Sequence, residues 1–326
     1  MKKNNMNPRK YDTIKKFNIS DVRTAMIYSR DEIPEDYHGK DIIIGEWLGE
    51  LYHTLTDQYY TQSMRSQYYF PDVKPEGGFD KHICPGHWQG YRWAIQNFTN
   101  SGDMILDPTV GTGTAVVESI NHGRNAIGIE LEFCDITKRT IQVQYDRANE
   151  NGSVVPLGNG TIINGDAREL NHLLHDKGFI GNEIFDLVIN GTPYPVLGGG
   201  QSDAPERGYT SEGKGATIQY EKDKNVGILK GQKYWDTVLA IYTEAIGKLK
   251  RGGKFITIIK DPTQNKKPYL LHKMIADMLM ENLPVKPYGT FIHRHLPQTL
   301  FMNTYPKRYP EVKIPLYQTG TVLEKY

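Results

Sequence analysis

A glycine-rich turn and three acidic residues mark the part of the sequence best suited to binding a nucleotide. Asp107 opens the run DPTVGTGT, and the glycines at 111 and 113 let a backbone approach a ligand closely. Glu130 and Asp166 end the next two short apolar runs. Such acids are often only helix N-caps, and tight turns need glycine anyway. Three acids at the ends of three successive strands nevertheless favour one nucleoside-binding crevice, in which an acid holds the ribose hydroxyls.

A second turn has residues suited to chemistry on an amine. The sequence Asn190-Gly191-Thr192-Pro193-Tyr194 follows the apolar run FDLVIN. Polar side chains and backbone carbonyls accept hydrogen bonds from an amine, and an aromatic ring stacks on a base. Gly, Thr and Pro are also ordinary loop residues, so a plain turn is the alternative interpretation. The position after a strand that faces the crevice favours the functional interpretation.

The elements that must position these turns alternate between short apolar runs and helical segments from residue 102 onward. The pattern predicts a parallel sheet with helices on both faces. Strands are expected at 104–107, 126–130, 161–164, 185–190 and 255–260, helices at 114–121, 136–148 and 235–249, and a turn at Gly252-Gly253. A further helix with an apolar stripe is expected over 41–55.

The run DPTVGTGT resembles the D-P-F-x-G-x-G-T signature of amino-methylating DNA methyltransferases, with Thr109 in place of the aromatic residue. The segment 82–98 is similar to the family segment that closes over the methionine part of the cofactor. The resemblance covers about residues 80–326. It implies an α/β, Rossmann-like S-adenosylmethionine-dependent methyltransferase fold, a mostly parallel seven-stranded sheet with a terminal antiparallel hairpin. The hairpin strands are expected near 288–293 and 319–326.

The same resemblance implies S-adenosylmethionine as the cofactor. Asp107 and the glycines would lie near its methionine and sulfonium end, Glu130 would hold the ribose, and Asp166 the adenine. The cofactor-binding residues implied in this way are His82, Asp107, Pro108, Thr109, Gly111, Gly113, Thr114, Glu130 and Asp166.

The catalytic turn departs from the family form, (Asp/Asn/Ser)-Pro-Pro-(Tyr/Phe/Trp). Gly191 stands at the polar position and Thr192 at the first proline, while Pro193 and Tyr194 match. Asn190 is one residue early, and a shift of one residue along a strand reverses the side-chain direction. Either a distorted turn or the Thr192 hydroxyl supplies the polar group, or the protein binds cofactor and DNA without turnover. If this position limits chemistry, Gly191→Ser together with Thr192→Pro is expected to raise turnover.

The expected organisation is an N-terminal extension over 1–80 and a methyltransferase domain over 81–326. A flap at about 195–230 would carry target contacts, because long loops in compact domains are usually functional or disordered. The cofactor motif precedes the catalytic motif, which is the γ-like order. The net charge is +1, but residues 244–326 hold 14 Lys and Arg against 6 Asp and Glu, which fits either a polyanionic partner or a solvated surface of scattered lysines. Contacts to DNA are expected from Arg294, His295, Lys307 and Arg308.

These features together predict methylation of cytosine N4 or adenine N6 in DNA, on a base flipped out of the duplex. Two alternatives stay open: an RNA base methyltransferase, and a catalytically impaired DNA-binding protein. The chain has two cysteines and neither is in the catalytic turn, so cytosine C5 chemistry and a cysteine-rich zinc site are excluded, and no metal is expected. No apolar run reaches membrane-spanning length. The expected setting is the cytoplasm of a prokaryote or phage-infected cell, with a restriction endonuclease as a possible partner.

Overall fold

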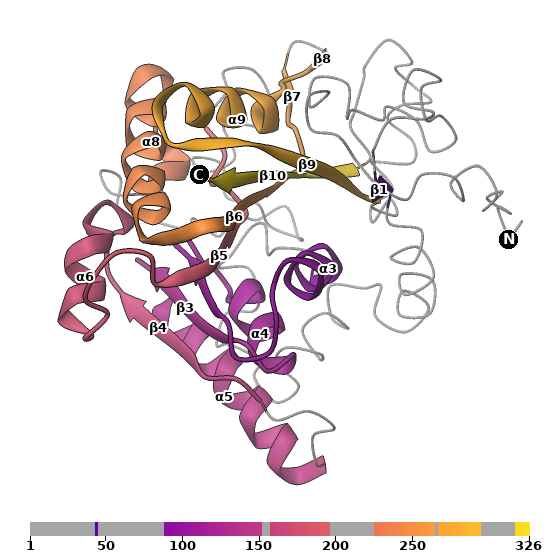
Figure 1. Ribbon diagram of the computed structural model, residues 1–326, viewed down its shortest axis with the longest axis vertical. Coiled ribbons are helices and arrows are strands. Elements are labelled where there is room, and N and C mark those ends of the chain that lie inside the picture. Colours follow the sequence, from indigo (N-terminus) through magenta and orange to yellow (C-terminus); the bar gives the residue numbers. More distant parts are fainter. Residues whose placement is uncertain (1–42, 45–87, 152–156, 196–224, 265–266, 295–316) are drawn as a thin grey trace, which may run out of the picture.

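The computed structural model describes residues 43–44, 88–151, 157–195, 225–264, 267–294 and 317–326. Within them, eight strands form one sheet in the order β1-β9-β10-β6-β5-β2-β3-β4 (Figure 1). The strands are β1 (Ile43–Ile44), β2 (Met104–Asp107), β3 (Asn125–Glu130), β4 (Gly160–Asn164), β5 (Phe185–Asn190), β6 (Leu249–Ile259), β9 (Val285–Arg294) and β10 (Tyr317–Lys325). A separate small pair is formed by β7 (Thr263–Gln264) and β8 (Lys267–Pro268).

All pairs in the large sheet are parallel except those of β10, which runs antiparallel to both β6 and β9. The expected fold class is therefore confirmed, including the terminal hairpin. The expected number of strands is wrong: the large sheet of the described residues has eight strands and not seven, because β1 adds an edge strand beside β9. The central strands are nearly continuous apolar runs, as is typical of parallel strands buried on both faces.

Helices cover both faces of the sheet. They are α3 (Trp88–Phe98), α4 (Thr114–Asn121), α5 (Cys134–Asn151), α6 (Leu170–Asp176), α8 (Gly231–Lys248) and α9 (Leu271–Asn282), with short 3-10 turns η5 (Ala167–Glu169) and η6 (Val226–Ile228). One buried cluster joins α6, α8 and α9 to one face, and a second joins α3, α4 and α5 to the other (Figure 1).

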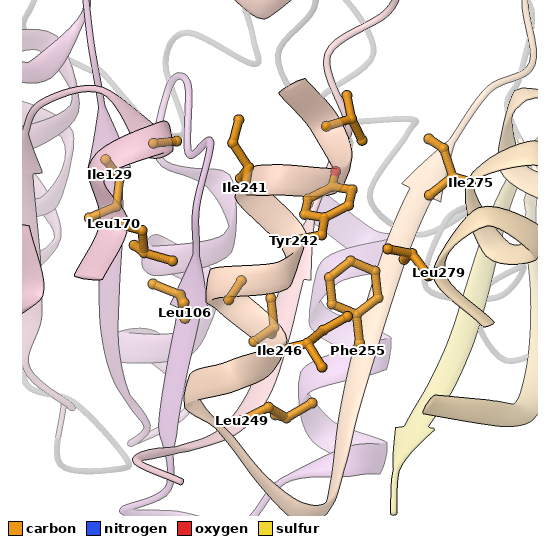
Figure 2. Close-up of a cluster of buried hydrophobic side chains, with 14 of the residues drawn as sticks. Leu106, Ile129, Leu170, Ile241, Tyr242, Ile246, Leu249, Phe255, Ile275 and Leu279 are labelled. Carbon is orange, nitrogen blue, oxygen red and sulfur yellow. The ribbon is translucent and has the colours of Figure 1, made fainter. Parts of the chain in front are cut away.

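The face under α8 shows how the sequence pattern builds this packing. Tyr234, Val238, Ile241 and Tyr242 recur at helical spacing and are all buried. Figure 2 shows Tyr242 beside Phe255 of β6, with its hydroxyl directed away from that ring. Complete burial of a side chain of this size contributes about 1.5–3 kcal/mol, so the stripe fixes α8 on the sheet.

Two local predictions are wrong. The helix expected over 41–55 is contradicted at Ile43–Ile44, which pair in parallel with Phe291 and Ile292; consecutive β-branched residues suit the edge of a sheet. The rest of that helix lies outside the described residues. Gly252-Gly253 is not a turn between elements: both lie inside β6, where the pairing with β5 jumps from Leu249 to Lys254. The register of the two strands is therefore irregular at this point, and the positive φ of Gly252, 76°, suits glycine.

Candidate active site

The candidate site lies where the order of the strands reverses. β2 continues through α4 to β3 on one side, whereas β5, which pairs with β2, leads to β6 on the other side. In open parallel sheets such a reversal leaves a crevice at the carboxyl ends of the two strands. Asp107 ends β2 and Asn190 ends β5, so the two turns singled out by the sequence flank this crevice.

Asp107 is a buried acid at the start of the first turn. Its side chain is 3% exposed, and its Oδ1 accepts a hydrogen bond from the Thr109 N–H at 3.0 Å. Burial raises the pKa of Asp107 to about 8, and the negative charge of Glu130 adds to this effect. Among the described residues, neither acid forms an ion pair with Lys or Arg. The crevice therefore holds two buried carboxyl groups with no Lys or Arg paired to them among the described residues.

Glu130 combines a structural and an electrostatic role. Its Oε1 accepts hydrogen bonds from the N–H groups of Glu132 and Phe133 at 2.9 and 3.0 Å, so it caps the turn after β3. Burial raises the pKa of Glu130, while backbone donors, Gly111 among them, oppose the increase. The Glu130 carboxylate thus connects the end of β3 with the glycine turn.

The glycines of the turn are required by geometry. Gly111 and Gly113 have φ values of 56° and 92°, in the left-handed region that favours glycine. A Cβ at Gly113 would also lie 2.8 Å from Cγ2 of Thr137. The Thr137 hydroxyl donates to the Gly111 carbonyl at 2.6 Å and holds the loop. Gly113 precedes α4 without a side-chain cap, so the first amides of the helix can face an anionic or polar ligand. Pro108 and Thr114 are buried within this turn, and Thr109 is half-buried.

Asp166 follows β4, beside the end of β3, because Asn164 pairs with Glu130. Its carboxylate accepts from the Arg168 backbone N–H at 3.0 Å and forms an ion pair with the Arg168 guanidinium at 2.5 Å. Asp166 therefore caps η5, one of the two interpretations that the sequence allowed.

The second turn is tied to α8 by two tyrosines. The Asn190 amide donates to the Tyr242 hydroxyl at 2.8 Å, and the Thr192 hydroxyl lies 2.6 Å from the same oxygen. The Tyr234 hydroxyl donates to the Pro193 carbonyl at 2.7 Å. These hydrogen bonds from α8 fix the main-chain path of the turn.

The ring of Tyr194 is half-buried, and its hydroxyl accepts from the Lys260 backbone N–H at 3.1 Å. The turn is therefore also attached to the end of β6. Asn190 Nδ2 lies 3.5 Å from the Thr109 hydroxyl, which brings the two turns into direct contact. Its Oδ1 is buried without a hydrogen-bond partner among the described residues, which is unusual for a polar atom.

Strand alternation places the side chains of the second turn on opposite faces. Val188 packs in the cluster under α8, whereas Leu187 and Ile189 pack in the cluster with α3. Asn190 follows Val188 toward α8, and Gly191 faces α3. A Cβ at Gly191 would lie 2.9 Å from the hydroxyl oxygen of Tyr91.

The chain after the flap returns to the crevice. The Asn225 amide donates to Glu132 Oε1 at 3.2 Å, and its Oδ1 accepts from the Gly227 N–H at 2.7 Å. Residues 196–224 of the expected flap lie outside the described residues, as do His82, His295, Lys307 and Arg308. The backbone of Arg294 ends β9, paired with Tyr317.

Three further residues of the site carried no sequence signal. Thr137, Tyr242 and Tyr91 each meet a turn that is at least 26 positions away in the chain, and each lies on a helix whose residue pattern reports burial only. Their contacts depend on how α5, α8 and α3 are placed against the sheet.

Residues 3–139 match the sequence model of a DNA methylase family, a stretch that includes the glycine turn but ends before the second turn. The chain is also 24% identical over 120 residues to the Type II methyltransferase M.BglI of Bacillus subtilis. That alignment covers 36% of this chain and 34% of the relative, so the matched part is about a third of the relative's length. These matches support the amino-methylating DNA methyltransferase family.

The chain also has a loose likeness to solved structures at low sequence identity. TrmN from Thermus thermophilus is 13% identical with a TM-score of 0.38, over 74% of this chain and half (50%) of its own. An S-adenosylmethionine-dependent methyltransferase from Methanosarcina mazei is 12% identical with a TM-score of 0.42, over 75% of this chain and 98% of its own. In the described part of the chain, no helix has the length and apolar character needed to cross a membrane.

Proposed function

We propose that the chain transfers a methyl group from S-adenosylmethionine to an exocyclic amine in DNA, cytosine N4 or adenine N6, on a flipped base. The observation that carries this proposal is the meeting of two turns at the carboxyl ends of β2 and β5. The first has the glycine geometry and acids of a nucleoside site, and the second has a half-buried tyrosine after a proline. The match to a DNA methylase family supports DNA as the substrate.

The crevice suits this cofactor in charge and in shape. Burial raises the pKa values of the Asp107 and Glu130 carboxyl groups, and S-adenosylmethionine carries positive charge on its sulfonium and ammonium groups. The left-handed φ values of Gly111 and Gly113 allow the tight turn that leads from β2 into α4, as a nucleoside-binding turn requires. Asp107 and the glycine turn would hold the methionine end, Glu130 the ribose and Asp166 the adenine.

When bound, S-adenosylmethionine supplies a methyl group on a positively charged sulfur. The residues of this chain would orient the amine and remove water from it. The ring of Tyr194 offers a face for stacking, and its position is fixed through Lys260. The Gly191 carbonyl is an acceptor for one amine N–H. No cysteine nucleophile stands in the turn, so transfer to the amine is direct.

The test is a methylation assay with deuterated S-adenosylmethionine on duplex DNA, single-stranded DNA and RNA, followed by nucleoside mass spectrometry. Label in N4-methylcytosine or N6-methyladenine from DNA is the expected result, and it also identifies the base. Label in RNA alone would move the function to an RNA base methyltransferase. Cofactor binding by calorimetry without label in any pool would leave a DNA-binding protein with an impaired catalytic turn, the alternative that Gly191 motivates.

A pair of variants at one position separates stacking from folding. Tyr194→Ala removes the ring that would stack on the base, where stacking contributes about 1–3 kcal/mol per base, and should lose most activity. Tyr194→Phe keeps the ring and removes the acceptor of the Lys260 N–H, so it should stay active.

That a restriction endonuclease is a partner of this protein stays a prediction.

A further inference from the structure

Gly191 and Tyr91 occupy the same small volume at the end of β5. A Cβ built on Gly191 would lie 2.9 Å from the Tyr91 hydroxyl oxygen, closer than real Cβ contacts come. The other neighbour within 4 Å is the Ile258 carbonyl, at 3.7 Å. Any larger residue at 191 would therefore displace this hydroxyl. Glycine is what lets the tyrosine reach the turn.

The distance from the Cβ position of residue 191 to the Tyr91 oxygen can be compared with the reach of a polar side chain at that position. Ordinary bond lengths place the terminal oxygen of an Asp or Asn side chain roughly 2.4 Å from its own Cβ. The Tyr91 oxygen is at 2.9 Å from the same point for residue 191. A hydroxyl from α3 thus lies at nearly the distance from the turn at which the family form carries its polar side chain.

The helix that carries Tyr91 is firmly attached to the rest of the fold. The neighbouring Arg92 donates from Nε to the carboxylate of Glu118 at 2.8 Å, and Glu118 lies on α4 with no exposed surface. At the position after Arg92, the Trp93 ring packs against the ring of Phe291 of β9, with the two ring centroids 4.6 Å apart. α3 is therefore fixed both to the helix that follows the glycine turn and to the sheet, and Tyr91, 4% exposed, is held between them.

We propose that the Tyr91 hydroxyl replaces the missing polar side chain at position 191 and accepts a hydrogen bond from the target amine. This inference rests on the proposed function and names a catalytic residue for it. The alternative source of a polar group, Asn190, is directed to the opposite face, where its amide donates to Tyr242. The absence of a side chain at Gly191 and the position of the Tyr91 oxygen are thus two sides of one arrangement.

The chemical step balances without another reagent. The amine nitrogen forms a bond to the methyl carbon as the sulfur–carbon bond breaks, and the bonding electron pair stays on sulfur as a neutral thioether. The methylated nitrogen then loses one proton to water. An acceptor on one amine hydrogen keeps electron density on nitrogen during the attack, and both the Tyr91 oxygen and the Gly191 carbonyl can serve in that way.

The test relocates the oxygen. Tyr91→Phe removes it and should lower kcat about 100-fold, with the KM for DNA and the affinity for S-adenosylmethionine unchanged. The swap Tyr91→Phe with Gly191→Ser removes the collision and returns a hydroxyl from the turn, so it should regain most of the loss. Gly191→Ser alone should have a lower Tm than the wild type, because the collision remains. Tyr145→Phe is the matched control: it removes another tyrosine hydroxyl, bonded to Gly158 at the amino edge of the sheet.

Each result has a distinct meaning. An active wild type with a folded Tyr91→Phe variant of equal kcat would overturn this inference and leave the proposed function standing. A folded swap no faster than Tyr91→Phe would overturn it as well. Should Tyr91→Phe not fold, Gly191→Ala serves instead, because it displaces the hydroxyl while keeping the tyrosine; full kcat in that variant refutes the role. A wild type without activity on any nucleic acid overturns both proposals.

Discussion

Asp107→Asn separates the cost of burying a charge from the benefit of binding a cation. Asparagine keeps the oxygen that accepts the Thr109 N–H and removes only the ionisable group. The ordinary pKa of the carboxyl is 3.8 and burial raises it to about 8, so the folded protein without cofactor holds Asp107 protonated at neutral pH. Folding at pH 7 therefore includes the uptake of a proton by a group that is ionised in the unfolded chain.

The magnitude follows from the two pKa values. One pH unit corresponds to 1.36 kcal/mol, so holding the proton at about pH 7 costs about 4 kcal/mol of folding free energy. Because the folded pKa of this acid is raised, its contribution to stability falls as the pH rises from about 4 to about 8, and is constant above. The asparagine side chain of the variant never ionises. The variant should be up to about 4 kcal/mol more stable at pH 7, with the difference vanishing near pH 4.

Urea unfolding of the wild type and the variant from about pH 4 to about pH 8 measures the difference in their free energies of unfolding. The titration of all other groups is the same in both proteins, so it cancels in this difference. Calorimetry of S-adenosylmethionine binding gives the second half of the prediction. The cation should drive ionisation of Asp107, so the wild type releases nearly one proton on binding at about pH 7, detected by repeating the titration in buffers of different ionisation enthalpy. The variant should release none from this site and should bind far more weakly.

Two results would refute the reasoning. A stability difference that is the same near pH 4 and near pH 8 would mean that the Asp107 charge is not penalised by burial. Equal affinity of the two proteins for S-adenosylmethionine would mean that the carboxyl does not face a cationic ligand.

Three further changes probe the scaffold of the site. Gly113→Ala should destabilise the fold and weaken cofactor binding, and adding Thr137→Ser, which keeps the hydroxyl bond to the turn but removes the colliding methyl, should recover part of the loss in urea unfolding. Arg92→Met removes the guanidinium that pairs with the buried Glu118 carboxylate and should cost about 3 kcal/mol, less when combined with Glu118→Gln, by the same measurement. Tyr242→Phe takes the shared partner from two buried polar groups of the second turn and should cost about 1–3 kcal/mol.

The sequence was sufficient for the elements with a strong local pattern. The predicted bounds of β2 and α4 agree with the structure, since an apolar run followed by glycines leaves little freedom in where a strand ends and a helix begins. Two α-helices were missed. α9 follows a polar turn without a local start signal, and it is placed by a tertiary bond, from the His272 N–H to Asp261 Oδ1 at 3.0 Å. α3 is positioned by contacts that are distant in sequence, from Trp93 to Phe291 and from Arg92 to Glu118.

The candidate site was predictable only along single strands. Period-two alternation correctly indicated that Asn190 and Gly191 face opposite sides, because that rule needs no knowledge of neighbours. Which helix each would meet depends on packing across the sheet. The Tyr242 and Tyr91 hydroxyls lie 52 and 100 positions away in sequence, so no motif of five residues reports them.

The contacts of the second turn with Tyr91 and Tyr242 reverse one expectation from the sequence. Gly191→Ser with Thr192→Pro restores the family form, and was expected to raise turnover if position 191 limits chemistry. In the structure, the serine Cβ would collide with the Tyr91 oxygen, and the proline would remove the hydroxyl that Thr192 shares with Tyr242 at 2.6 Å. Overpacking of this kind costs typically about 1–3 kcal/mol, and the lost bond adds to it. The double variant should therefore show lower kcat and lower Tm than the wild type. A faster double variant would mean that the turn tolerates the family form and that the hydroxyl from α3 is dispensable.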